Sequence, residues 1–493
     1  MLGTAIASIA SAASLTTAII TTDHTALRAA PRDSAQQQAV LRQGEMVEIR
    51  GERLDYLQVY DYQRERAGFV RASQVRRVAL TPAEAPELLA VLRFVKDTPG
   101  QEALGIGLAA AWLKAAPAAM VQGEPGIEAL DALGTLAGRL ANRASSGALA
   151  SKATEATVAA HLDVAGRYGV RFTSYEQDVR MQVCYEGEAF RRVLAMPQAS
   201  AQQQARAALG LTAPECVDGN LRALERTQLD QWRADVLDKV DTAALPPYMK
   251  NRVLMRRAGV WSGLAFARTR QLDAPPSAKA DAAVAAGRAL ESLAGVDRAE
   301  LTDDDLPAYN DAAMRVNASR WAAVAPAPVA TASKAPFIAT TPGQPGETCV
   351  LLLDAGHDAA HPLARRCTYS VVWTQSATLN REGSALALAV QPMPAWRELW
   401  LFRKQADGWS ISVLPPAAMA PDTGYAEFAG WVPGGKQVLV AREARGEGRY
   451  QRSFMVTSID SLVPERQSDD PKALGAFQRW QDAAWARQSV SVR

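Results

Sequence analysis

The stretch Gly44-Glu-Met-Val-Glu-Ile49, followed by Tyr56-Leu-Gln-Val-Tyr60 and Gly68-Phe-Val70, decides the fold of the N-terminal part of the chain. Apolar and polar residues alternate along the first two segments, which is typical of β-strands with one buried face. The segments are short and are separated by glycines and charged residues, which indicate turns. With the earlier segment Thr25-Ala-Leu-Arg28, they predict a small, strongly bent β-barrel over residues 24–79.

The order of these segments resembles the bacterial SH3-like (SH3b) family. The family pattern has a threonine-x-leucine-arginine start, a glycine before an apolar strand, an aromatic-x-x-valine strand and a final glycine-aromatic-valine. The residues that match this pattern are Thr25, Leu27, Arg28, Gly44, Val47, Ile49, Tyr56, Val59, Gly68, Phe69 and Val70. Tyr56 and Phe69 stand where the family more often has tryptophan. The resemblance implies an SH3-like barrel that binds cell-wall peptide.

Aromatic residues supply the candidate binding site of this module. Tyr56, Tyr60 and Tyr62 occupy alternate positions, so they project from one face of a strand. Exposed aromatic rings offer peptides or glycans an apolar platform with a hydrogen-bonding rim. We therefore take Tyr56, Tyr60, Tyr62 and Phe69 as the candidate ligand-binding residues. The alternative is that Tyr56 packs into the barrel and the module merely docks on the rest of the chain.

Length and composition limit the classes of protein to which this chain can belong. The 493 residues are enough for two to four domains, and 48% of them are hydrophobic, as in folded globular proteins. The 54 basic and 52 acidic side chains nearly cancel. This balance argues against a nucleic-acid partner, because phosphate binding needs an excess of positive charge.

Residues 1–22 form an apolar N-terminal segment. Leu2 to Ile20 carry no charge, and Ala10-Ser11-Ala12 resembles a cleavage site of small residues, so the segment is a candidate secretory signal peptide. The basic residues that usually precede such a run are missing, and the alternative is an apolar first strand. No segment has the composition of a stable membrane span. We expect a periplasmic or secreted bacterial protein.

The middle of the chain has the composition of helices. Alanine-rich amphipathic runs separated by proline and glycine predict an α-helical domain over residues 84–323. Five prolines then fall between residues 324 and 346, which predicts a semi-stiff linker.

Beyond the linker, residues 347–493 change to a period of two and predict a β-rich domain that ends in a helix. Two segments look like copies: Asn380-Arg-Glu-Gly383-Ser-Ala-Leu-Ala-Leu388 and Val432-Pro-Gly-Gly435-Lys-Gln-Val-Leu-Val440. Their glycines are 52 positions apart (435 − 383), which is near the period of propeller blades. Residues 366–462 thus weakly resemble TolB-type blades. The predicted fold class is multidomain α+β, comprising the SH3-like barrel, the helical domain and a β-rich domain with blade-like repeats.

The four cysteines divide between two of these domains. Cys184 and Cys216 fall in the helical part, whereas Cys349 and Cys367 bracket the start of the β-rich part. Parity alone allows three pairings or four free thiols. The domain assignment favours disulfides between Cys184 and Cys216 and between Cys349 and Cys367, which would fit an oxidising compartment.

Catalytic motifs are scarce. His357 and His361 would share a helix face and could bind zinc, but Pro362 follows at once and no third ligand is spaced to join them. A loop is the favoured interpretation, and we predict no metal site and no cofactor. The nucleophile elbow, the phosphate loop and the dinucleotide motif are absent from the sequence. Paired carboxylates leave no motif and stay open.

These observations favour a non-catalytic cell-envelope protein that acts as a scaffold. Its expected partner is cell-wall peptide or an envelope protein, bound through the SH3-like module, and its oligomeric state is left open. One alternative is a peptidoglycan hydrolase that uses the module for targeting. Another is an interaction subunit whose blade-like repeats form the binding platform.

Overall fold

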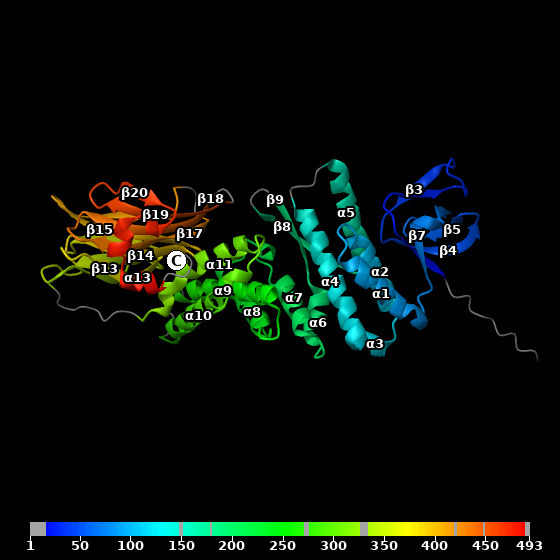
Figure 1. The fold of residues 1–493 in the computed structure, drawn as a ribbon, viewed down its shortest axis with the longest axis horizontal. Helices are drawn as coiled ribbons and strands as arrows, with labels where there is room; N and C mark the ends of the chain where they lie inside the picture. The colour runs from blue at the N-terminus through cyan, green and yellow to red at the C-terminus, as the bar shows by residue number, and fades with distance from the viewer. Residues whose placement is uncertain are drawn as a thin grey trace, which may run out of the picture. The chain divides into compact units, whose positions relative to one another are not determined.

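The computed structural model describes residues 16–146, 151–177, 180–270, 276–325, 334–418, 422–446 and 449–488. The chain divides into two compact units, Met1–Asn220 and Leu221–Arg493, here called the first and the second unit (Figure 1). Each unit contains both helices and sheets, so the fold is mixed α+β. In the described residues, none of the helices has both the length and the apolar character that crossing a membrane requires.

The first unit begins with a seven-stranded antiparallel sheet, here called the N-terminal sheet. Its strands are β1 (Thr17–Ile20), β2 (Thr25–Arg28), β3 (Gln37–Leu41), β4 (Met46–Arg53), β5 (Tyr56–Asp61), β6 (Arg66–Arg71) and β7 (Val75–Val78). They pair in the order β3-β2-β6-β5-β4-β1-β7. Over the described residues no pairing joins β3 to β7, so the strands do not form a closed barrel.

Seven helices and a hairpin follow the N-terminal sheet. The helices are α1 (Ala85–Lys96), α2 (Glu102–Ala115), α3 (Ala118–Gln122), α4 (Glu124–Ser145), α5 (Lys152–Arg167), α6 (Glu188–Ala195) and α7 (Ala201–Leu211), with short 3-10 turns at η2 (Pro82–Glu84) and η3 (Pro214–Cys216). A further 3-10 turn, η1 (Ala72–Gln74), lies within the sheet region, between β6 and β7. The hairpin consists of β8 (Phe172–Gln177) and β9 (Arg180–Tyr185). It interrupts a region whose sequence predicted only helices.

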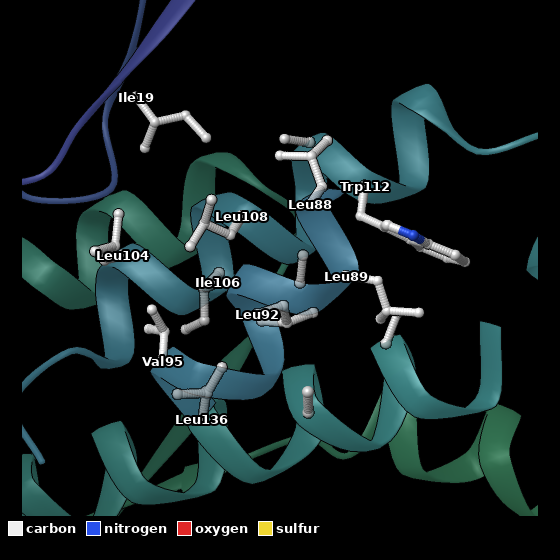
Figure 2. Packing of buried hydrophobic residues seen from close by; sticks show 14 of the residues in the cluster. Ile19, Leu88, Leu89, Leu92, Val95, Leu104, Ile106, Leu108, Trp112 and Leu136 are labelled. Atoms are coloured by element: carbon white, nitrogen blue, oxygen red, sulfur yellow. The ribbon is translucent and has the colours of Figure 1, made fainter. Parts of the chain in front are cut away.

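Strand β1 lies inside the segment 1–22 and belongs to the folded core. It pairs with β4 on one side and with β7 on the other. Ala18 and Ile20 are buried in the core of the N-terminal sheet, whereas Ile19 points to α1 and α2, where it packs near Leu104 and Leu108 (Figure 2). A strand covered on both faces has no alternation, because every position is apolar. Residues 17–20 are thus a strand, while Ala10-Ser11-Ala12 lies outside the described residues.

The second unit begins with a helical layer. Its helices are α8 (Ala223–Asp238), α9 (Pro247–Thr269), α10 (Pro276–Ala294) and α11 (Leu306–Ser319), with 3-10 turns at η4 (Arg298–Glu300) and η5 (Arg320–Ala323). Helix α9 is central and packs against the other three. The residues 84–323 that the sequence predicted as one helical domain are therefore shared between the two units.

The strands of the second unit form two sheets. A small sheet contains β10 (Phe337–Pro342), β11 (Thr348–Leu353) and β12 (Ala364–Thr368); β10 occupies part of the predicted linker, whose residues 326–333 are outside the described ones. The larger sheet contains two antiparallel meanders: β13 (Val371–Leu379), β14 (Ala385–Met393), β15 (Trp396–Gln405) and β16 (Gly408–Leu414), then β17 (Thr423–Val432), β18 (Gln437–Gly446), β19 (Arg449–Ser458) and β20 (Pro464–Ser468). The chain continues through η6 (Pro471–Ala473), α12 (Gly475–Trp480) and α13 (Ala483–Gln488).

The two meanders touch through β15 and β17, which run parallel for a short distance. Only two pairs of residues are in register there, Trp396 with Gly424 and Arg397 with Tyr425. Beyond these two residue pairs, β15 and β17 are no longer neighbours in the sheet, and the two meanders separate.

Each unit holds one disulfide. Cys184 on β9 is bonded to Cys216 on η3, and Cys349 is bonded to Cys367, which faces it in register across β11 and β12. The four cysteines of the chain are thus all paired, in the connectivity that the sequence favoured. Each bridge stabilises its own unit, by about 2 to 4 kcal/mol for loops of this size.

Candidate functional site

The candidate binding site is the outer face of the N-terminal sheet, formed by β4, β5 and β6. Leu57, Val59 and Val70 point into the core of the sheet. The residues between them therefore project from the opposite side. Three cross-strand pairs lie on this outer face: Tyr60 with Glu48, Tyr56 with Arg71, and Gln58 with Phe69.

Half-buried Tyr60 and exposed Tyr62 form an aromatic pair on this face. Their ring centroids are 4.9 Å apart and the planes are 79° apart, an edge-to-face arrangement. The Tyr62 side chain is 63% exposed. The guanidinium of Arg50 lies 3.9 Å from the centroid of the Tyr60 ring. Arg50 takes this position because it is the extra residue of a β-bulge between Ile49 and Gly51.

Glu48 completes what is here called the aromatic cluster, which consists of Glu48, Arg50, Tyr60 and Tyr62. The Tyr62 hydroxyl donates a 2.6 Å hydrogen bond to Glu48, and Arg50 lies 3.3 Å from the same carboxylate oxygen. The hydrogen bond from Tyr62 lowers the pKa of Glu48 and raises the pKa of Tyr62 itself. The cluster thus presents two rings, a cation and a carboxylate that stays ionised at neutral pH.

Tyr56 does not contribute a surface ring. It is only 2% exposed, and its hydroxyl donates a 2.6 Å hydrogen bond to Asp33 in the loop between β2 and β3. Arg71 also donates to Asp33, through Nε at 3.0 Å, and reaches Asp55 at 2.8 Å. The hydrogen bonds from Arg71 and then from Tyr56 lower the pKa of Asp33 to about 2. Tyr56 therefore fastens this loop over the sheet, and the expectation that its ring is exposed is wrong.

Phe69 lies on β6, the strand next to β5, and is half-buried. It stands opposite Gln58, the residue of β5 between Tyr56 and Tyr60. Of the four candidate residues, the structure brings Tyr60 and Tyr62 together at the surface and buries Tyr56. Phe69 lies on the neighbouring strand and is half-buried.

Another side of the N-terminal sheet is occupied by helices of the same unit, as in the alternative in which the module docks on the rest of the chain. His161 of α5 is buried and its Nε2 lies 2.8 Å from Asp23. Although burial raises the pKa of Asp23, hydrogen bonds from His161 and from the backbone of Gln43 keep it below its usual value. Beside them, Gly44 has a φ of +86°, and a Cβ there would lie 2.3 Å from the carbonyl of Ala103 on α2. A glycine is thus required where the sheet meets the helix.

The buried polar contacts on this side extend to the end of α5. Glu45 is 5% exposed and accepts hydrogen bonds from Arg64 at 3.0 Å and from Arg167 at 2.8 Å. The Tyr168 hydroxyl donates to the carbonyl of Gly44 at 2.6 Å. These contacts fix this side of the sheet to the helices. The accessible aromatic surface is therefore the one on the outer face.

The two histidines near β11 do not share a helix. Residues 354–363 form turns, in which Nδ1 of His357 lies 2.7 Å from Asp354 while the His361 side chain is 88% exposed. Within the described part of the chain, the one grouping of three possible metal ligands is Glu347 with Cys349 and Cys367, and its two thiols are joined in the disulfide.

Comparisons of the chain with protein-family models, with curated proteins and with solved structures gave no match.

Proposed function

We propose that this protein is a non-catalytic scaffold of the bacterial cell envelope that binds cell-wall peptide through its N-terminal sheet. The observation that carries the proposal is the Tyr60–Tyr62 pair on the outer face, in which Tyr60 contacts Arg50 and the exposed Tyr62 is hydrogen-bonded to Glu48. The sequence resemblance of residues 24–79 to SH3-like modules points to the same ligand class. An envelope protein with an exposed peptide of the same chemistry is the alternative partner.

The aromatic cluster suits a short peptide that carries both carboxylate and amino groups, as cell-wall stem peptides do. The tyrosine rings give a flat apolar surface with hydroxyls at the rim. Arg50 can bind a ligand carboxylate, and Glu48 can bind an ammonium group. Because these two side chains neutralise each other in the free protein, ligand binding would exchange one ion pair for two.

Two further features support an envelope protein. The two disulfides are compatible with an oxidising compartment, where such bonds form and persist. The two meanders of the second unit support the blade-like interpretation of residues 366–462. Gly383 and Gly435 occupy equivalent turns, between the first and second strands of each meander, and have φ of +66° and +68°. The turns also touch, since Gly434 N–H donates to Glu382 at 2.9 Å.

A sedimentation assay of the full chain with purified murein tests the proposal. We expect wild-type protein to sediment with murein and the Tyr60→Ala/Tyr62→Ala variant to lose about tenfold in affinity, since exposed aromatic residues at the centre of an interface carry most of its energy. Tyr369→Ala is the matched control, because Tyr369 is a 53% exposed tyrosine of the second unit. Equal retention of the double variant and wild type would overturn the proposed site. A clearing zone on a murein gel would instead identify a hydrolase.

A further inference from the structure

The second unit contains a cavity of about 240 Å³ beside the place where β15 and β17 diverge. Its wall comes from η5, from strands of both meanders and from α13. The lining residues used below are Arg320, Trp321, Arg397, Glu427, Phe428 and Trp485. Sequence reasoning assigned none of them to a site.

Two buried arginines share one buried carboxylate in this wall. Arg320, Arg397 and Glu427 are 4%, 0% and 3% exposed. Nε of Arg320 donates a 2.9 Å hydrogen bond to Oε1 of Glu427, and Nη2 of Arg397 lies 3.4 Å from the same oxygen. The remaining acid of the wall, Asp482, is half-buried and accepts hydrogen bonds from the first backbone N–H groups of α13.

Arg397 keeps its charge although it is fully buried. Burial lowers its pKa to about 10, which is still well above neutral pH. Its Nη1 donates to the carbonyl of Asn317 at 2.6 Å. A buried charge that is only partly compensated is costly, and it favours an additional negative group nearby.

The unpaired polar atoms of the wall are all donors. In the described part of the chain, Nε of Arg397, Nε1 of Trp321 and Nε1 of Trp485 are buried without a hydrogen-bond partner, while Nη2 of Arg397 has the ion-pair contact with Glu427. Guanidinium and indole N–H groups can only donate. Each such buried group that lacks an acceptor destabilises the fold, because it has lost its hydrogen bonds to water. Three unpaired donors around one cavity therefore call for a ligand that is rich in acceptors.

We propose that this cavity binds a small carboxylate that has an aromatic or aliphatic body. Arg397 and the two indole N–H groups would hold the carboxylate oxygens. The rings of Trp321, Phe428 and Trp485 would cover the apolar body. This site is independent of the aromatic cluster, and either can fail without the other.

Calorimetric titration of the full chain with phenylacetate tests the proposal. We expect phenylacetate to bind about tenfold or more tightly than phenylacetamide, because hydrogen bonds to a charged group are worth roughly 1.5 to 3 kcal/mol. Inorganic phosphate is a probe of the charge alone and should bind more weakly than phenylacetate. Equal binding of the acid and the amide, stronger binding of phosphate, or no binding of phenylacetate would each overturn the proposal.

Two matched tryptophan variants locate the binding. Trp321→Phe removes one N–H of the cavity and keeps a ring, so phenylacetate should bind about 5-fold more weakly for the loss of one hydrogen bond. Trp431→Phe removes an indole N–H that is also buried and unpartnered in the described structure but does not line the cavity, so affinity should be unchanged. Arg397→Met should abolish binding. If that variant does not fold, the tryptophan pair still decides: equal affinity of the two would place the ligand elsewhere and overturn the proposal.

Discussion

The outer face of the N-terminal sheet and the cavity of the second unit use arginine, carboxylate and aromatic rings in opposite ways. On the outer face, Glu48 is bonded to Tyr62 and paired with Arg50, at the surface. In the cavity, Arg397 is fully buried, and its Nε has no hydrogen-bond partner among the described residues. Similar residue types thus suit different ligands in the two regions. A satisfied, exposed cluster suits a large polar ligand that exchanges contacts, whereas unsatisfied buried donors suit a small anion.

The largest expected effect comes from removing the support of the N-terminal sheet. Deleting residues 1–22 removes β1 and with it Ile19 and Ile20, each fully buried. At roughly 1.5 to 3 kcal/mol for each of the two buried isoleucines, the first unit should lose about 3 to 6 kcal/mol of unfolding free energy. Deleting residues 1–12 keeps β1 and serves as the control. Urea unfolding followed by hydrogen exchange in the first unit measures both, and equal stability of the two deletions would contradict the assignment of β1 to the core.

Replacing one carboxylate in each region by the neutral amide tests directly whether burial separates the two regions. Glu427→Gln leaves Arg320 and Arg397 without their shared buried partner, so the second unit should lose about 3 to 5 kcal/mol. Glu48→Gln acts on a pair at the surface, in which the Arg50 side chain is 43% exposed, and should cost clearly less than Glu427→Gln. Denaturant titrations of the two variants check the contrast. Similar losses would mean that burial does not separate the two regions as described.

Removing each disulfide should have an intermediate effect that is confined to one unit. Replacing Cys184 and Cys216 by serine, or Cys349 and Cys367 by serine, should cost about 2 to 4 kcal/mol. The first bridge closes the longer loop, 32 against 18 positions, which favours it by about 0.5 kcal/mol. Unit-resolved hydrogen exchange is the measurement. A loss of protection in the other unit would show that the units do not unfold separately.

The smallest expected effect is the loss of stability at low pH when Asp33 is protonated. Asp33 lies in the loop that Tyr56 holds over the sheet. The pKa of Asp33 in the folded chain is lowered to about 2, below the ordinary value of 3.8. The stabilisation that this provides is thus fully present above the ordinary pKa and is lost as pH falls through about 2. Tyr56→Phe should move the pKa of Asp33 upward, and NMR titration of the carboxyl carbons measures the shift. An unchanged midpoint would show that the hydroxyl does not act on Asp33.

The strands of the outer face could be predicted from sequence because one side of them is buried and the other is wet. Alternation along residues 44–60 records that difference, and it also identified Tyr60 and Tyr62. It could not show that the loop carrying Asp33 covers Tyr56, since burial by a distant loop leaves no period. Strand β1 was only the alternative interpretation of its segment, because both of its sides are buried and an apolar run without alternation is also typical of a leader sequence.

The cavity was beyond the reach of sequence reasoning because its charges come from distant elements. Arg320 and Glu427 are 107 positions apart, and each one alone is an ordinary charged residue in a helix or strand. Only the pairing of β15 with β17 brings Arg397 to the same place. Cysteine pairing was easier, because each pair falls within one region of the sequence.

The central claim, that the aromatic cluster is the peptide-binding site, is tested most directly by calorimetric titration of the full chain with a purified cell-wall stem peptide. Wild type, Tyr60→Ala/Tyr62→Ala and Trp321→Phe should be compared. We expect the tyrosine variant to bind about tenfold more weakly and Trp321→Phe to bind as wild type does. Unchanged affinity of the tyrosine variant, or a loss caused by Trp321→Phe alone, would contradict the claim.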